Sequence, residues 1–377
     1  MHDRRMRFFN LARGAAAISI ALLVAMIFIL ISSKTPWTAM RYLLIGPLLS
    51  FHEGAVIFNA QYLYQVLAAT IPIIFTGLAV TVMFSANQFN LAGEGCVLAG
   101  GFVGGVLGVY LNINSGWHWV VSVLIATAVC GVIMLIPALL KVKLGASEMV
   151  TSLMLNFIIL YVVLHYLNFH FADRTKGATM TKEFKPTAII PSLVAGNSKL
   201  TVGFIVAIAA TILVALFMYR TRWGYAIRMI GINESFSLYS GMNVGWTIVL
   251  AQVIGGMLSG MGGSIEVLGR YQTYLWRDLP GYGWVGITIA ILAKNNPIYV
   301  PLAAFFIAYL NKGCLLMSTY CDVPVEMIDI IQAAIFLFFA AEQFLSGYRQ
   351  KLVVKTTQED LMKLDVNQLR GGGKSHA

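Results

Sequence analysis

The sequence predicts an all-α fold, a polytopic helical membrane protein with about ten transmembrane segments. Hydrophobic residues make up 58% of the 377 residues and charged residues only 11%, whereas soluble domains carry about 25% charged residues. Apolar runs long enough to span a bilayer recur along the whole chain. The first run, residues 14–31, is followed by Ser32, Ser33 and Lys34 rather than by a cleavage site, so we expect a retained span and not a signal peptide.

Nine of the predicted segments are full-length and one is short. We expect them at residues 14–33, 64–84, 91–111, 117–140, 149–169, 201–219, 245–265, 284–294, 298–317 and 328–347. The eighth, 284–294, gives about 16 Å of helix, half of a bilayer, and is flanked by Gly281, Gly283 and Pro297. Short segments bounded by glycine or proline are typical of the broken helices of transporters. We therefore expect one membrane domain over residues 1–347 and a separate tail over 348–377.

The lysines and arginines predict the orientation. If the N-terminus lies in the cytoplasm, 16 of the 26 basic residues fall on the cytoplasmic side and 10 outside, five of them in the long loop 170–200. Long loops count little in the positive-inside rule, so both termini and the tail are expected in the cytoplasm, and the loops 34–63 and 170–200 outside. The net charge of +10 fits basic residues that flank spans and does not call for a nucleic-acid partner.

The sequence contains no pattern for a metal, a cofactor or catalysis. The four cysteines lack metal-site spacing. His165 and His170 are five apart, whereas a helical metal pair needs a spacing of four. The terminal GGGKS has Gln368 where a phosphate-binding loop needs its first glycine. We therefore expect neither an enzyme nor a bound cofactor.

Small residues cluster in GGFVGGVLG (100–108) and GGMLSGMGG (255–263). Small residues four apart let helices approach closely in lipid. We expect close helix contacts there, and static contact is favoured over a moving interface.

Polar residues within or near the spans are candidates for a solute path, because ionisable groups in a bilayer are costly. The carboxylates mostly lie within a turn or two of a span end, where pairing or exposure to water explains them; they are Glu94, Glu148, Glu266, Glu326, Asp329 and Glu342. Deeper uncharged groups either bind a solute or, as the favoured interpretation, bond neighbouring helices; they are Asn156, Thr76, Gln252 and Gln332. The predicted substrate path consists of Thr76, Asn90, Glu94, Glu148 and Asn156.

The turn FNLAGEG (89–95) joins the second and third predicted spans. Asn90 can cap the next helix, and Glu94 in its first turn suits the positive end of the helix dipole. The turn is either a well-formed helix start or a solute gate on the cytoplasmic side.

The stretch RTRWGYAIRMIGINESFSLYSGMN (220–243) is too polar to cross a membrane and too patterned for a loose loop. Residues 223–230 predict a short helix that ends at Gly231. Asn233 predicts the N-cap of a second helix, with Glu234 in its first turn and Gly241 at its end.

Phe236 and Tyr239 fall three apart, on one face of this second helix. We therefore expect a helix–turn–helix at the membrane surface with exposed aromatic side chains. It is either an interfacial anchor or a docking element for a cytoplasmic partner.

Part of this stretch, GYAIRMIGINESFSLYSGM, resembles the cytoplasmic coupling segment of ABC-importer permeases of the branched-chain amino acid, monosaccharide and nucleoside branch. Three further stretches agree in order and spacing: FNLAGEG (89–95), GASEMVTSLMLN (145–156) and GITIAILAKNNP (286–297). Together they look most like the larger permease of nucleoside systems that depend on a basic membrane lipoprotein. The chain departs from the family at Phe236 and Ser237, where two alanines are frequent, and at Cys96, where glutamine is frequent.

The resemblance implies a set of partners. A docking helix from Asn233 to Gly241 would enter a cleft on a separate cytoplasmic ABC ATPase, and the implied docking residues are Arg228, Gly231, Asn233, Glu234, Phe236, Tyr239 and Gly241. It also implies a second permease subunit, a different chain, and an external substrate-binding lipoprotein that the outer loops would contact. The expected location is the bacterial cytoplasmic (inner) membrane, in contact with lipid.

We therefore expect the membrane-spanning subunit of an ATP-driven importer that moves a nucleoside or related small polar solute by alternating access. The alternative is an ion-coupled secondary transporter that works without an ATPase, which predicts charged groups at the bilayer midplane that the sequence lacks. A membrane-embedded enzyme or respiratory subunit would need paired histidines or a catalytic constellation, and none has usable spacing.

Overall fold

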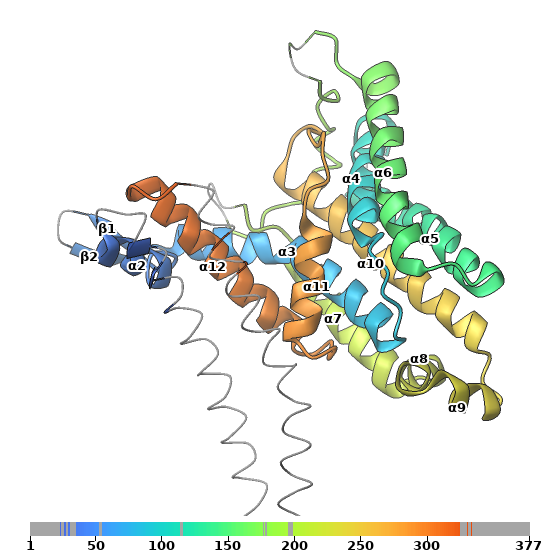
Figure 1. Cartoon of the computed structure of the whole chain (residues 1–377). Helices are drawn as coiled ribbons and strands as arrows, with labels where there is room; N and C mark the ends of the chain where they lie inside the picture. Colours follow the sequence, from blue (N-terminus) through green and yellow to red (C-terminus); the bar gives the residue numbers. More distant parts are fainter. Residues whose placement is uncertain are drawn as a thin grey trace, which may run out of the picture. The chain divides into compact units, whose positions relative to one another are not determined.

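Figure 1 shows the computed structural model, which describes residues 35–324 except 53–54, 114–115, 176, 178 and 195–198, together with residues 23, 26, 27, 29, 30, 330 and 333. The predicted spans 14–33 and 328–347 lie almost wholly outside the described residues, as do the tail 348–377 and Glu326, Asp329, Glu342 and Gln332. The chain divides into two compact units, residues 1–40 with 318–377, and residues 41–317.

In the part of the chain that the structure describes, seven helices are long and apolar enough to cross a membrane, by length and composition. They are α3 (Ala60–Ser85), α4 (Gly93–Tyr110), α5 (His118–Leu144), α6 (Glu148–Tyr166) with its π-helical continuation η1 (Leu167–Phe171), α7 (Gly203–Arg220), α10 (Val244–Arg270) and α12 (Val300–Tyr320). The apolar helix α11 (Tyr282–Leu292) is shorter. These eight coincide with the second to ninth predicted segments, so the multi-pass helical prediction is confirmed over this range.

The predicted outer loop 34–63 contains secondary structure that the sequence analysis did not predict. Helix α2 (Pro36–Leu44) is followed by β1 (Leu49–His52) and β2 (Ala55–Phe58), which pair antiparallel with Leu49 opposite Phe58. Each strand has four residues, too few for an alternating pattern to stand out from the apolar sequence around it.

The loop 170–200 is held against the ends of α4 and α10. The Lys185 N–H donates to the Gly108 carbonyl at 3.0 Å, and the Ile190 N–H donates to the Leu268 carbonyl at 3.1 Å. His118, at the start of α5, is buried and lies 2.8 Å from the Thr187 hydroxyl. The described residues of this loop therefore cover one end of the bundle.

Helices α3 and α10 form the centre of the larger unit. Helix α10 packs against α3, α4 and α5, and α11 packs against α3, as Figure 1 shows for α10 beside α4 and α5. The most apolar stretch of α3 is 89% buried, whereas those of α6 and α7 are 33% buried. The apolar sides of α6 and α7 therefore face lipid or another chain.

The glycine-rich segments meet where α4 crosses α10. A Cβ atom on Gly263 would collide with the Val97 carbonyl oxygen, and one on Gly100 would collide with the Gly260 carbonyl oxygen. The two backbones touch there, and a larger side chain would force them apart. The close helix contacts predicted at each segment are confirmed, and the structure adds that the two segments contact each other.

Candidate functional site

The polar stretch 220–243 folds into two short helices at one end of α7 and α10 (Figure 1). Helix α8 (Arg222–Ile232) begins after Thr221, whose hydroxyl accepts a hydrogen bond from the Gly224 N–H at 3.1 Å. Helix α9 (Glu234–Tyr239) begins after Asn233, whose side-chain oxygen accepts from the Phe236 N–H at 2.9 Å. The prediction of two helices with Asn233 as the second cap is confirmed.

The end of α9 follows from Gly241, which has φ +79°, a left-handed conformation that favours glycine. The Gly241 N–H donates to the Leu238 carbonyl at 3.0 Å, and the Met242 N–H donates to the Ser237 carbonyl at 3.1 Å. These bonds satisfy carbonyl groups of the last turn, so α9 is closed at both ends despite its six residues.

The predicted role of Gly231 as the end of the first helix is wrong. Helix α8 continues through Gly231 to Ile232 and stops at Asn233, whose backbone is extended. A Cβ atom on Gly231 would overlap the carbonyl oxygen of Ser85, the last residue of α3. The missing side chain lets α8 abut the end of α3, which fixes the two-helix segment to the most buried span.

The outer surface of α9 is apolar. Phe236 is 54% exposed, Leu238 61% and Tyr239 89%, and Ile232 at the end of α8 is 78% exposed. Glu234 is also exposed, on the same short helix. The predicted docking residue Arg228 instead turns inward, with its guanidinium 5.1 Å from the centre of the Tyr219 ring. The α9 surface therefore offers aromatic and aliphatic side chains beside a carboxylate, on a rigid support.

The turn 88–92 between α3 and α4 carries a buried amide network. Asn90 donates to the Gln252 side-chain oxygen at 2.8 Å, and its own oxygen accepts from the Ala92 N–H at 2.8 Å. Gln252, on α10, donates to the Gln88 side chain at 3.3 Å. All three amides are almost fully buried. The prediction that Asn90 caps α4 is wrong, because the N-cap position is Ala92 and no side chain caps it. Asn90 instead bonds within the turn and ties it to α10.

Helix α6 holds the other side of this turn. The Asn156 oxygen accepts from the Gly95 N–H at 2.9 Å, and its amide group donates to the Leu91 carbonyl at 3.0 Å. One turn earlier, the Ser152 hydroxyl accepts from the Leu91 N–H at 2.9 Å. Both side chains are fully buried. The turn is thus bonded to α6 and to α10 at once.

Glu94 connects the start of α4 to the start of the half-helix α11. Its carboxylate is 1% exposed and accepts hydrogen bonds from the Gly281 and Gly283 N–H groups. Gly281 is the N-cap position of α11. These N–H groups carry the positive end of the α11 dipole, so a carboxylate is the complementary partner. Glu94 therefore acts as a cap supplied from a residue 187 positions earlier in the chain.

Of the two remaining predicted path residues, Glu148 lies beside this turn, where it bonds the Phe89 backbone, and Thr76 lies within α3. Glu148, at the start of α6, forms an ion pair with Lys141 of α5 at 2.8 Å. Thr76 is fully buried and donates to the Pro72 and Ile73 carbonyls within α3. A Cβ atom on Gly286 of α11 would collide with Thr76, so Thr76 lies at the contact between α3 and α11. The structure thus groups Asn90, Glu94, Glu148 and Asn156 around the turn 88–95 and places Thr76 within α3.

The sequence analysis missed the segment 271–281, which leads from α10 to α11. It lines a hollow of about 440 Å³ with the rings of Tyr271, Trp276 and Tyr282. Tyr274 anchors the segment, because its ring is fully buried against Phe102 with 5.4 Å between the ring centres. Burial raises the pKa of the Tyr274 hydroxyl. The aromatic run YQTYLW between two spans was the available signal.

Comparison with known proteins identifies relatives over most of the chain. A family described as branched-chain amino acid transport system, permease component, matches residues 62–340. The glucose ABC transporter permease protein TsgB13 of Haloferax volcanii is 29% identical over 76% of this chain and 78% of its own length. The guanosine ABC transporter permease protein NupP of Bacillus subtilis is 29% identical over 77% and 85%, respectively.

The nucleoside ABC transporter permease protein NupB of Lactococcus lactis is 29% identical over 76% of this chain and 81% of its own length. A second Bacillus subtilis protein, the guanosine ABC transporter permease protein NupQ, is 22% identical over 67% and 82%. No solved structure matches the chain.

Proposed function

The chain belongs to the permease component family of branched-chain amino acid transport systems, and on this premise we propose that it imports a nucleoside or a related small polar solute. It is a multi-pass permease of an ABC importer, and ATP hydrolysis occurs on a partner ATPase. Similarity to the guanosine permease NupP and the nucleoside permease NupB supports the choice of solute. A sugar is the second candidate, because TsgB13 is a glucose permease of equal identity.

The exposed apolar surface of α9 is the observation that supports a docking role. Phe236 and Tyr239 project from a helix that is capped at both ends and fixed to α3 through α8. We propose that α9 enters a cleft on the ATPase, with Glu234 and Gly241 at its two ends. Because α8 abuts α3, a movement of α9 would pass directly to the most enclosed span.

The proposed topology has ten segments with both termini in the cytoplasm. The eight described segments fit eight of these, and the residues 141–143 and 220–228 then bring their basic side chains to the cytoplasmic side together with α9. The loop 170–200 and the segment 271–281 would face outward, toward an external substrate-binding lipoprotein. The aromatic hollow of 271–282 would be the first surface of this chain that a solute meets.

The proposed solute path follows the turn 88–95 and helix α11. Asn90, Glu94 and Asn156 are bonded to protein groups, so their contribution would be to hold the wall of the path in shape. During alternating access, α11 would then either move together with Glu94, which caps it from α4, or separate from Glu94.

A second permease is part of the proposed complex. Bacillus subtilis has two guanosine permease proteins, NupP and NupQ, that both resemble this chain, the first at 29% and the second at 22% identity. In a complex of two different permeases, the second chain would cover part of the exposed apolar surface of this chain.

The first test is affinity purification of the tagged chain in mild detergent, followed by mass spectrometry. The wild type should bring down an ABC ATPase, and Glu234→Arg or Gly241→Trp should lose it while the second permease is retained. Glu183→Arg, a carboxylate of the 170–200 loop, is the matched control and should recover the ATPase normally. Recovery of the ATPase with both α9 variants would remove α9 as the docking element.

The solute is tested by ATP-dependent uptake into vesicles that contain the complex and its binding protein. Labelled guanosine should accumulate and excess unlabelled uridine or adenosine should compete, whereas glucose should not. Competition by glucose alone would exchange the nucleoside proposal for the sugar proposal and leave the family assignment intact.

A further inference from the structure

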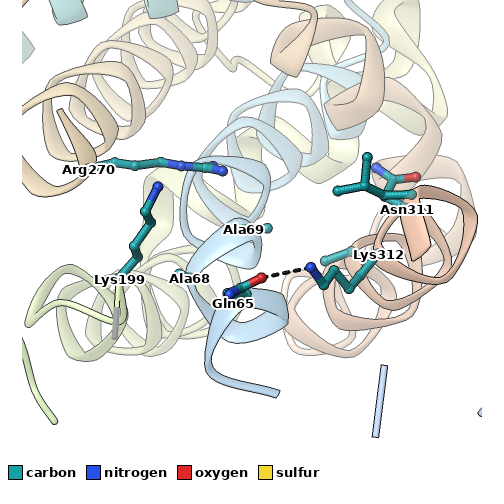
Figure 2. Close-up of a pocket in the computed structure, with 9 residues that line it drawn as sticks. Gln65, Ala68, Ala69, Lys199, Arg270, Asn311 and Lys312 are labelled. Atoms are coloured by element: carbon teal, nitrogen blue, oxygen red, sulfur yellow. Dashed lines mark hydrogen bonds between the residues drawn. The ribbon is translucent and has the colours of Figure 1, made fainter. Parts of the chain in front are cut away.

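A cavity of about 250 Å³ in the larger unit is lined by three cationic side chains. Lys199 lies just before α7, Arg270 is the last residue of α10, and Lys312 belongs to α12. Figure 2 shows Arg270 and Lys199 side by side, with Gln65 and Ala69 of α3 between them and Lys312. Helices α10 and α12 and the residue Lys199 before α7 thus direct three positive charges toward one space beside α3.

These charges are only partly balanced. Arg270 donates to the Glu266 carboxylate at 3.0 Å, and that buried carboxylate also interacts electrostatically with Lys199. Lys312 donates to the neutral Gln65 side chain at 2.7 Å, lies 4.8 Å from the centre of the Tyr62 ring, and is repelled by Arg270. Within the described part of the chain, the cavity therefore has three cations facing one carboxylate.

The excess positive charge lies where lysine and arginine are not expected. In the proposed topology all three cations lie toward the outer side, where the positive-inside rule does not favour lysine or arginine. Lys312 belongs to an apolar helix long enough to span the membrane, and a charged side chain in a span is costly unless it has a partner or a function. A bound anion would supply the missing partner.

We propose that this cavity binds a phosphate group, either in the headgroup of an anionic phospholipid or as a free phosphate. The guanidinium of Arg270 offers a planar donor to phosphate oxygens, and the two lysines act as point charges on either side. The site is separate from α9 and from the turn 88–95, and it does not depend on which solute the chain transports.

The test compares lipid binding by the full chain, purified with the subunits that accompany it. The variant is Lys199→Gln with Lys312→Gln; Arg270 is left intact because its loss would strand Glu266. Native mass spectrometry after exchange into mixed phosphatidylglycerol and phosphatidylcholine should show phosphatidylglycerol retained by the wild type about tenfold more than by the variant. Lys143→Gln, which removes one exposed lysine at the end of α5, is the control for loss of a lysine outside the cavity and should behave as wild type.

A second arm identifies a soluble ligand. In phosphatidylcholine nanodiscs, millimolar phosphate should raise the melting temperature of the wild type and of Lys143→Gln above that in chloride of equal ionic strength, and should leave the double variant unchanged. Selective lipid retention assigns the site to a headgroup, and the phosphate-dependent shift assigns it to a free anion. If neither ligand distinguishes the wild type from the variant, the proposal is overturned. Should the double variant fail to fold, Lys312→Gln alone takes its place, with the same outcomes expected in weaker form.

Discussion

The strongest prediction concerns Glu94, the residue that caps α11 from a distant part of the chain. Glu94→Ala removes the acceptor for the Gly281 and Gly283 N–H groups without adding bulk. Both donors lie where the segment 271–281 enters α11, and Gly283 is buried. We expect α11 to open locally while the rest of the bundle stays folded, because the bonds of Glu94 to this helix involve only its first turn.

The free-energy cost of Glu94→Ala is calculated from the two N–H donors that lose their acceptor. A buried N–H group left without a partner costs about 1–3 kcal/mol, so two of them give about 2–6 kcal/mol before the lost interaction of the carboxylate with the helix dipole is added. Even the lower bound, about 2 kcal/mol, corresponds to roughly 30-fold more frequent opening. Glu94→Gln keeps one acceptor oxygen but turns an NH₂ group toward the other donor, so about half of the effect is expected.

Hydrogen–deuterium exchange measured by mass spectrometry reports this opening directly. Peptides covering 281–292 should exchange roughly 30-fold faster or more in Glu94→Ala, with peptides from α5 unchanged. Glu148→Ala is the matched control, since Glu148 also begins a span but pairs with Lys141 and does not contact α11. Unchanged exchange at 281–285 in Glu94→Ala would refute the argument that this carboxylate holds the half-helix in place.

Three further perturbations test other contacts. Asn233→Ala removes the N-cap of α9 at a cost of about 1 kcal/mol; exchange in α9 should rise about fivefold and ATPase recovery should fall, while Asn233→Asp keeps both near wild type. Gly263→Ala places a Cβ atom against the Val97 carbonyl and should destabilise the bundle by about 1–3 kcal/mol, seen as a lower melting temperature. Gly116→Ala, which meets open space, should not lower it, and equal melting of the two variants would contradict the close helix contact. Asn156→Leu strands the Gly95 N–H and the Leu91 carbonyl and should cost about 2 kcal/mol or more in thermal unfolding, whereas wild-type stability would show that this bond is dispensable.

The positions of the membrane helices could be predicted because each span is a local property of the chain. Apolar length alone located the seven long described helices, and flanking glycine and proline located the short one at 284–294. The caps of α9 were also local, since Asn233 and Gly241 lie directly at its ends. For the same reason the end of α8 was misplaced: Gly231 resembled a helix stop, but its contact with Ser85 is a property of the folded bundle.

The contacts that shape the candidate site could not be predicted from the local pattern. Glu94 was identified as a group suited to the start of its own helix, whereas its hydrogen bonds go to α11. Asn90 was expected to cap α4, and its bond to Gln252 of α10 was not foreseen. The cationic cavity joins residues from α3, α10 and α12 and the residue before α7, which no single window of sequence contains.

The pairing of Asn90 with Gln252 has a consequence for how the protein is made. The two residues are 162 positions apart, and chains grow at about 5–20 residues per second, so roughly 8–30 s separate their synthesis. During that interval the amide of Asn90 has left the ribosome without its partner, as has the Glu94 carboxylate without α11. Water or a membrane insertase has to shield these groups until α10 and α11 arrive, so the early spans wait in an unfinished bundle whose closure depends on the second half of translation.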